Sequence, residues 1–206
     1  MLKIQKLTLG VFMTNCYFII DSDTRYCMVV DPADDFESIT EKIESDKLVL
    51  KAILLTHAHF DHIMALERLR KKYEVPVILA EEEDRILTDN ELNLLSVYGD
   101  GSSCTHGDVL LHDGDTIDLC GNTISMMTLP GHTPGSCAYI FDGNMICGDT
   151  IFRDGVGRYD LPEGDYRSLR ASLAKIGRLE YNYKLYPGHG PATNLEHEKN
   201  FNIYLQ

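Results

Sequence analysis

The chain has 206 residues, of which 44% are hydrophobic and 25% are charged, as is typical of a globular protein. Its formal net charge of −13 opposes binding to nucleic acid or anionic lipid, because phosphate groups bind clustered Lys and Arg. No apolar run approaches the roughly 20 residues that span a bilayer, and the N-terminus lacks a signal-peptide pattern. We therefore expect one domain over residues 1–206, with a cytoplasmic location and neither a nucleic-acid nor a membrane partner.

The first half of the chain alternates between strand and helix patterns. Strands are predicted at 2–9, 15–20, 26–30, 49–55 and 75–80, and helices at 34–46 and 63–73. An acidic helix is expected over 81–95, with Ile86, Leu87, Leu94 and Leu95 buried and its acidic side chains in solvent. The Gly- and Ser-rich segment 96–107 is expected to be a mobile loop at the rim of a pocket.

The second half repeats the order of the first approximately. Strands are predicted at 109–111, 116–119, 123–129, 136–141, 144–147 and 184–186, and helices at 165–179 and 194–204. Two similar halves of this kind predict an α+β fold, a four-layer αββα sandwich in which two mixed sheets pack together with helices outside.

One stretch combines a buried strand with a dense polar cluster. The apolar run that begins at Val49 stops at Thr56, and His57, His59, Asp61 and His62 follow within six residues. Such a run suits a strand buried on both faces, which places the polar residues at the rim of the sheet. Neutral imidazole and carboxylate groups bind divalent metals well, so a metal explains the cluster most simply.

Three later glycine-rich turns, each after a strand, add similar residues. They contribute His132, Asp149 and His189. Together with the first cluster, these turns contain five of the eight histidines, while His106, His112 and His197 are expected to be ordinary surface or hydrogen-bonded residues. Since a divalent ion takes three or four protein ligands, five histidines and two aspartates suffice for two metals that share one carboxylate.

These motifs resemble the metallo-β-lactamase superfamily, and more closely its short glyoxalase II-like (hydroxyacylglutathione hydrolase) branch. The HxHxDH motif of the superfamily stands here as His57-Ala58-His59-Phe60-Asp61-His62. The later motifs are GHTPGS with His132, GDT with Asp149 and PGHG with His189. The resemblance covers nearly the whole chain.

The resemblance implies a binuclear site. It assigns His57, His59 and His132 to one ion, Asp61, His62 and His189 to the other, and Asp149 to a bridging position. Zinc is the expected metal, and iron and manganese are alternatives that suit the same ligands. Two ions that share a hydroxide provide a nucleophile at neutral pH, and Asp61 is expected to orient it.

Two further residues are candidates near the site. Asp31 either orients a ligand imidazole, as carboxylates often do, or caps the turn before Pro32. Arg158 either pairs with Asp160 beneath the site or faces an anionic substrate, and the ion pair is the favoured interpretation.

The expected activity is hydrolysis of S-lactoylglutathione or a related small thioester. The classical glyoxalase II enzymes carry a C-terminal helical region that binds glutathione, whereas this chain ends soon after the last motif, which leaves another small thiol open. A persulfide dioxygenase with a single iron and a lactonase are the alternatives. A nuclease is disfavoured by the acidic charge, and a diiron electron-transfer module by His59, where such proteins usually have Glu.

Overall fold

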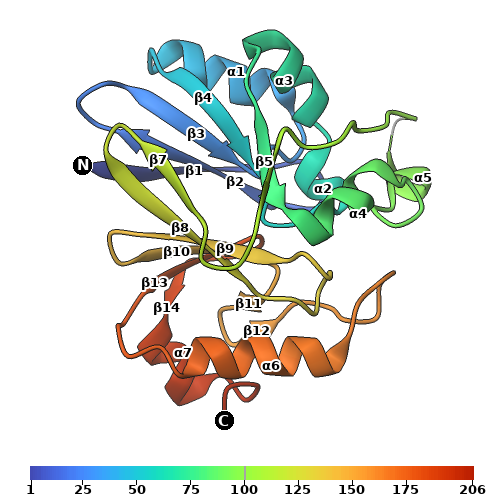
Figure 1. Ribbon diagram of the computed structural model, residues 1–206, viewed down its shortest axis with the longest axis vertical. Helices are drawn as coiled ribbons and strands as arrows, with labels where there is room; N and C mark the ends of the chain where they lie inside the picture. The colour runs from blue at the N-terminus through green and yellow to red at the C-terminus, as the bar shows by residue number, and fades with distance from the viewer. Residues whose placement is uncertain (100) are drawn as a thin grey trace.

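The computed structural model describes residues 1–99 and 101–206. Two six-stranded sheets lie face to face in the centre of the molecule, and helices cover their outer faces (Figure 1). Both sheets contain parallel and antiparallel pairs of strands. The predicted α+β fold, a four-layer αββα sandwich with mixed sheets, is therefore confirmed.

The first sheet has the strand order β1-β2-β3-β4-β5-β6. Its first three strands form an antiparallel meander, and β3 to β6 run parallel to one another. All eight residues of β2 are buried. The strands are β1 (Leu2–Leu9), β2 (Thr14–Asp21), β3 (Tyr26–Val30), β4 (Val49–Leu54), β5 (Val77–Ala80) and β6 (Val109–Leu111).

The second sheet has the order β14-β13-β10-β9-β8-β7, with β10 and β13 parallel and the other neighbours antiparallel. Two elements were not predicted: a separate hairpin of two short strands, β11 and β12, and the short strand β14. The strands are β7 (Thr116–Leu119), β8 (Asn122–Thr128), β9 (Cys137–Phe141), β10 (Asn144–Gly148), β11 (Ile151–Phe152), β12 (Gly155–Val156), β13 (Lys184–Pro187) and β14 (Thr193–Asn194).

Three apolar cores separate the four layers. Helices α1 (Phe36–Ser45) and α3 (Leu66–Tyr73) pack on the outside of the first sheet through residues such as Ile39 and Leu69. Helices α6 (Tyr166–Gly177) and α7 (Leu195–Phe201) pack on the second sheet (Figure 1). The third core lies between the sheets and contains Tyr17 and Tyr139. The apolar burial in these cores is the main force that holds the layers together.

The prediction of one continuous helix over 81–95 is wrong. The segment instead forms a 3-10 turn, η1 (Glu81–Glu83), a short helix, α4 (Asp84–Thr88), and a third helical turn, α5 (Leu95–Tyr98). The side chain of Asp89 accepts hydrogen bonds from the backbone N–H groups of residues 91 and 92, and such local bonds compete with helix formation. The expected solvent exposure of its acidic residues is also wrong for Glu83, which is only 1% exposed.

Helix α5 also occupies the start of the predicted loop 96–107. The mobility of this segment stays a prediction, and Asp100 within it lies outside the described residues.

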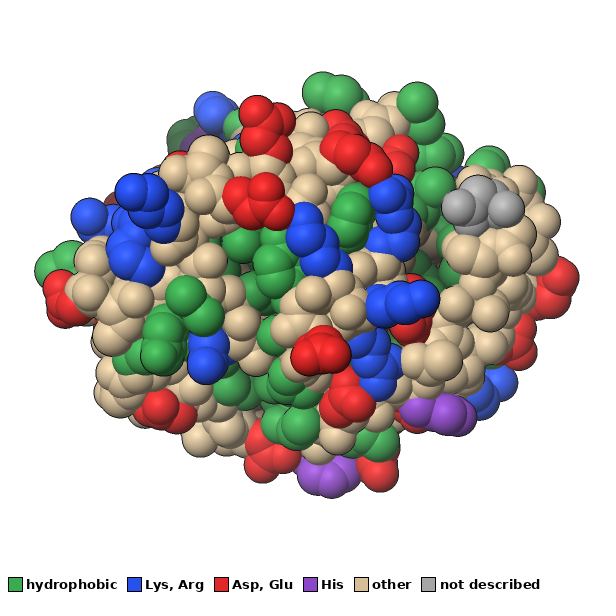
Figure 2. All heavy atoms as spheres, turned by 90° about the horizontal axis from the view of Figure 1, so that it is seen from above, with side chains coloured by type: hydrophobic (Ala, Val, Ile, Leu, Met, Phe, Trp, Pro, Cys, Tyr) green, Lys and Arg blue, Asp and Glu red, His purple; other side chains and the backbone are tan. Residues whose placement is uncertain are grey.

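The basic residues of α3 lie among acidic ones. Arg68 pairs with Glu37 at 2.6 Å and Lys72 pairs with Glu44 at 2.6 Å. Figure 2, which views the molecule from above the α1 and α3 side, shows Lys and Arg interspersed with Asp and Glu.

Across the described ranges, no helix has the length and apolar character needed to cross a membrane.

One buried hydrogen bond joins the two sheets beside the strand that leads into the histidine cluster. The hydroxyl of Tyr139, on β9, donates to the carbonyl of Leu55, immediately after β4, at 2.9 Å. Replacing Tyr139 by Phe should lower the free energy of unfolding by about 1–2 kcal/mol, because the buried carbonyl loses this donor. Urea denaturation measures the loss, and Tyr204→Phe, at a side chain that is exposed, is the matched control. Equal stability of the two variants would contradict the prediction.

Candidate metal centre

The polar residues predicted from the sequence meet at one edge of the sandwich. They lie on the segments that follow β4, β8, β10 and β13, and α2 (Phe60–Ile63) begins within the first of these segments. The chain passes very close to the site at Gly188, where an added Cβ would lie 2.1 Å from Asp149 Oδ1. Only glycine leaves room for this approach, which explains the glycine-rich turn.

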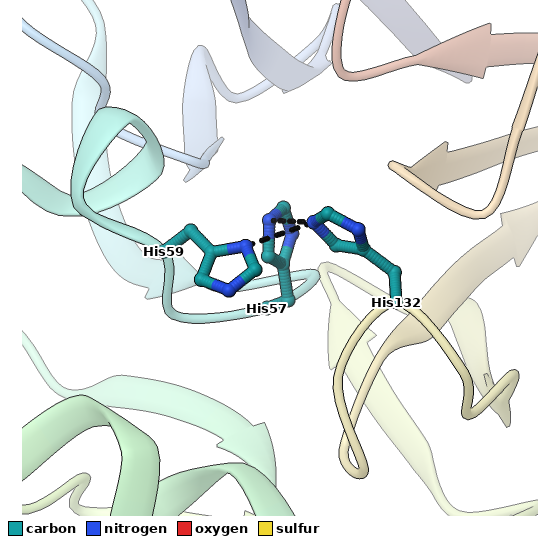
Figure 3. A group of neighbouring side chains, drawn as sticks. All are labelled: His57, His59 and His132. Carbon is teal, nitrogen blue, oxygen red and sulfur yellow. Dashed lines mark hydrogen bonds between the residues drawn. The ribbon is translucent and has the colours of Figure 1, made fainter. Parts of the chain in front are cut away.

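His57, His59 and His132, which we call the first group, point their ring nitrogens at one another (Figure 3). His132 Nε2 lies 2.8 Å from His59 Nδ1 and 3.2 Å from His57 Nε2. All three side chains are buried. Three convergent imidazole nitrogens offer the donor set of a divalent metal site.

Asp61, His62 and His189, which we call the second group, lie beside the first. Asp61 Oδ2 lies 3.2 Å from His189 Nε2 and 3.7 Å from His62 Nε2. Asp149 lies between the groups, because its Oδ2 is 3.4 Å from His189 Nε2 and 3.8 Å from His132 Nε2. The structure therefore brings all seven predicted residues together. His57, His62 and Asp149 also converge, so the two groups adjoin each other.

Outer hydrogen bonds aim the ring nitrogens of four histidines. The Nδ1 of His132 donates to the carbonyl of Arg158 at 2.7 Å, and that of His189 donates to the carbonyl of Phe12 at 3.1 Å. Because a neutral imidazole carries one proton, these bonds leave the Nε2 lone pairs directed into the site.

Asp31 orients the rings of His62 and His57, the first by direct contact and the second through Thr56. Its Oδ2 lies 3.0 Å from His62 Nδ1 and accepts a hydrogen bond of 2.6 Å from the hydroxyl of Thr56. Since that hydroxyl gives its proton to Asp31, its oxygen is the acceptor for His57 Nδ1 at 3.2 Å. These contacts agree with the first of the two predicted roles for Asp31.

Arg158 forms the predicted ion pair, at 2.9 Å from Nε to Asp160 Oδ1. The two side chains are 66% and 62% exposed, so the expected position beneath the site is wrong. Arg158 instead lines the mouth of a cavity of about 480 Å³ that opens over the two groups. Five of the seven predicted residues also border this cavity: His59, Asp61, His132, Asp149 and His189.

The first group favours neutral imidazoles. Burial lowers the pKa of His57 well below its usual value, and the neighbouring rings of His62 and His132 lower it further. Burial also lowers the pKa of His59 to about 3. A neutral ring keeps the lone pair that a metal needs, so the first group is preorganised for a cation.

The second group lies in a negative field. Burial by itself lowers the pKa of His62, but the charges of nearby carboxylates raise it to about 9. Burial is likewise outweighed at His189, where hydrogen bonds that the ring donates to the carboxylates of Asp149 and Asp61 raise the pKa to about 10. Carboxylates that stabilise imidazolium this strongly stabilise a divalent cation at the same place.

Two buried polar atoms support metal occupancy directly. His62 Nε2 and Asp149 Oδ1 are buried and have no hydrogen-bond partner within the described chain. Their mutual contact at 3.5 Å is longer than a good hydrogen bond, and a cation bound by both atoms would satisfy them. The residues present therefore fit a divalent metal centre.

Glu83, for which the sequence predicts no role, joins the two segments that carry the first group. Its Oε1 accepts the N–H of Ala58 at 2.8 Å, and its Oε2 accepts the N–H of Gly135 at 2.9 Å and the hydroxyl of Thr133 at 2.7 Å. Burial raises the pKa of Glu83 to about 7, while these hydrogen bonds oppose the rise. It is the third of three glutamates that follow the buried strand β5, and no sequence signal distinguishes it from Glu81 and Glu82.

Comparison with known proteins identifies the family of the chain. The family model of the metallo-beta-lactamase superfamily matches residues 9–189. The probable metallo-hydrolase YqgX of Bacillus subtilis is 34% identical, with 99% of this chain and 98% of the relative covered. The hydroxyacylglutathione hydrolase GloC of Haemophilus influenzae is 31% identical, with 99% and 98% covered.

A solved structure has the same fold. The crystal structure of the B3 metallo-beta-lactamase BLEG-1 superposes with a TM-score of 0.91 at 34% identity, with 99% of this chain and 100% of that chain covered. The chain belongs to the metallo-beta-lactamase superfamily. Within it, the similarity is to metal-dependent hydrolases of nearly the same length.

Separate variants should distinguish the two groups. We expect His57→Ala to weaken chiefly the first ion and Asp61→Ala the second, each lowering the metal content from about two ions per chain to about one. Elemental analysis of protein purified without added metal measures this content. His112→Ala, at an exposed histidine outside the site, should retain both ions. Equal loss of both ions in both site variants would show that the two groups do not fill separately.

Glu83 offers a test of the support behind the first group. All three partners of its carboxylate donate hydrogen bonds, so the amide NH₂ of Glu83→Gln must face a donor and cannot replace every bond. We expect about 10- to 100-fold weaker metal binding, measured by competition with a chelator. Glu82→Gln, at the exposed neighbour, is the matched control. Unchanged affinity in Glu83→Gln would contradict the prediction.

Proposed function

We propose that this protein is a binuclear metal-dependent thioester hydrolase of the glyoxalase II-like branch. The observation that supports the proposal most is the pair of neighbouring groups with Asp149 between them, beneath an open cavity. His57, His59 and His132 would hold one ion, and Asp61, His62 and His189 the other. Bound there, two divalent ions supply Lewis-acid polarisation of a carbonyl and a water of lowered pKa.

The residues of the chain organise that chemistry. Asp61 is held in place by the hydroxyl of Thr14, which donates to its Oδ2 at 2.8 Å. This bond fixes the carboxylate that we propose orients the attacking water. Asp31 and the carbonyl of Arg158 hold the imidazoles of His62 and His132 by their outer nitrogens.

The comparisons support the thioester assignment. GloC, which the chain matches over nearly its full length, is named a hydroxyacylglutathione hydrolase, and YqgX a probable metallo-hydrolase. Zinc is the proposed metal, since a set of five histidines and two aspartates suits it, and iron and manganese suit the same donors. The proposed partner is a small-molecule thioester, and the net charge of −13 supports the absence of a nucleic-acid partner.

The test uses the full chain loaded with zinc. We expect it to release thiol from small thioesters, S-lactoylglutathione among those assayed, as followed with a thiol reagent. Removal of the metal with a chelator should lower the rate at least about 100-fold, because both carbonyl polarisation and the activated water are lost, and added zinc should restore it.

Protein that holds two ions and leaves every thioester intact would overturn the proposal. Oxygen uptake with glutathione persulfide, together with one iron per chain, would identify a persulfide dioxygenase instead. Hydrolysis of lactones without thioester cleavage would identify a lactonase.

A further inference from the structure

One wall of the cavity is built from three aromatic rings. Phe12 comes from the turn between β1 and β2, Phe60 from α2 and Tyr98 from α5. The rings of Phe60 and Tyr98 stack at a centroid distance of 4.7 Å, and Phe12 meets Phe60 edge to face, also at 4.7 Å. All three residues border the cavity that opens over the metal centre, and we call them the aromatic wall.

Much of this wall is open to solvent. Tyr98 is 52% exposed and Phe12 is 43% exposed, and Val97, which also lines the cavity, is 65% exposed. Exposed apolar side chains that gather at a pocket commonly mark a binding surface for an apolar group. The wall continues directly into the site, since Asp61 follows Phe60 in the chain.

The cavity has few cationic side chains that could bind a negatively charged thiol such as glutathione. Within the described part of the chain, Arg158 is the one Lys or Arg that lines it. The guanidinium of Arg158 is already paired with both oxygens of Asp160, at 2.9 and 3.0 Å. Glutathione carries two carboxylates and one ammonium group at neutral pH, and apart from ions held at the metal centre its carboxylates would meet only this already paired guanidinium.

We propose that the aromatic wall binds the acyl group of an apolar thioester whose thiol is uncharged. This inference rests on the proposed thioester hydrolysis and names its substrate class. In the reaction the C–S bond of the thioester breaks, a C–O bond forms from water, and the products are a carboxylate, a thiol and one proton. The exposed apolar wall matches an apolar acyl chain, and the paired Arg158 leaves glutathione disfavoured.

The experiment compares four thioesters on the zinc-loaded full chain. The probes are the acetyl, hexanoyl and phenylacetyl thioesters of N-acetylcysteamine, which is an uncharged thiol, and S-lactoylglutathione. We expect kcat/KM for the hexanoyl and phenylacetyl compounds to exceed that for the other two at least about tenfold, the discrimination that a few buried apolar carbons provide.

Variants of the wall test the assignment to these residues. Tyr98→Ala should lower kcat/KM for the hexanoyl thioester about tenfold, mainly through KM, and change the acetyl thioester little, because only the longer chain reaches the ring. Val97→Asp should act in the same direction, and its exposed position avoids disturbing the core. Tyr204→Ala, at an exposed tyrosine outside the cavity, is the matched control. Metal content and thermal unfolding confirm that each variant is folded.

The outcomes separate the two proposals. Thioester hydrolysis that favours S-lactoylglutathione, or that ignores chain length, would overturn the inference and leave the proposed function standing. A preference for long acyl chains that survives in both Tyr98→Ala and Val97→Asp would also overturn it. Failure to cleave any of the four compounds with two ions bound would overturn the proposed function and the inference with it.

Discussion

The carboxylate of Asp31 is the contact on which the metal centre depends. It accepts hydrogen bonds from the backbone and the hydroxyl of Thr56, at 2.7 and 2.6 Å, and contacts His62 Nδ1 at 3.0 Å. Asp31 itself has a left-handed backbone, with φ of 53°, a conformation that costs about 1–3 kcal/mol and persists only where other contacts enforce it. These bonds join the end of β3 to the end of β4 and to α2, which places two imidazoles at once.

A second buried carboxylate, that of Glu83, holds the segments of the first group together. Glu83 holds Ala58 in one ligand segment and Thr133 and Gly135 in another, although these segments lie on different sheets. Buried carboxylates are stable only when their oxygens accept several hydrogen bonds, and here those bonds come from the segments that must be held together. The hydrogen bonds that stabilise the buried carboxylate of Glu83 therefore also fix the two ligand segments relative to each other.

The site combines two electrostatic environments and an apolar wall. Burial keeps the imidazoles of the first group neutral, whereas nearby carboxylates place the second group in a negative field, and Asp149 lies between the groups. The cavity above them is bordered on one side by aromatic rings. An apolar group bound against these rings would displace water beside the site, and that loss of water would strengthen charge interactions.

The sequence alone determined the layered fold and singled out the seven residues that the structure brings together, because strand periodicity and motifs such as His57 to His62 are local patterns. Only the tertiary structure decided the burial of Glu83, since an acidic run has the same composition whether it lies in solvent or behind a ligand loop. The break in the helix expected over 81–95 was likewise decided by side-chain hydrogen bonds that override propensity. The meeting of Phe12 with Tyr98 depends on packing between distant segments, for which no local pattern exists.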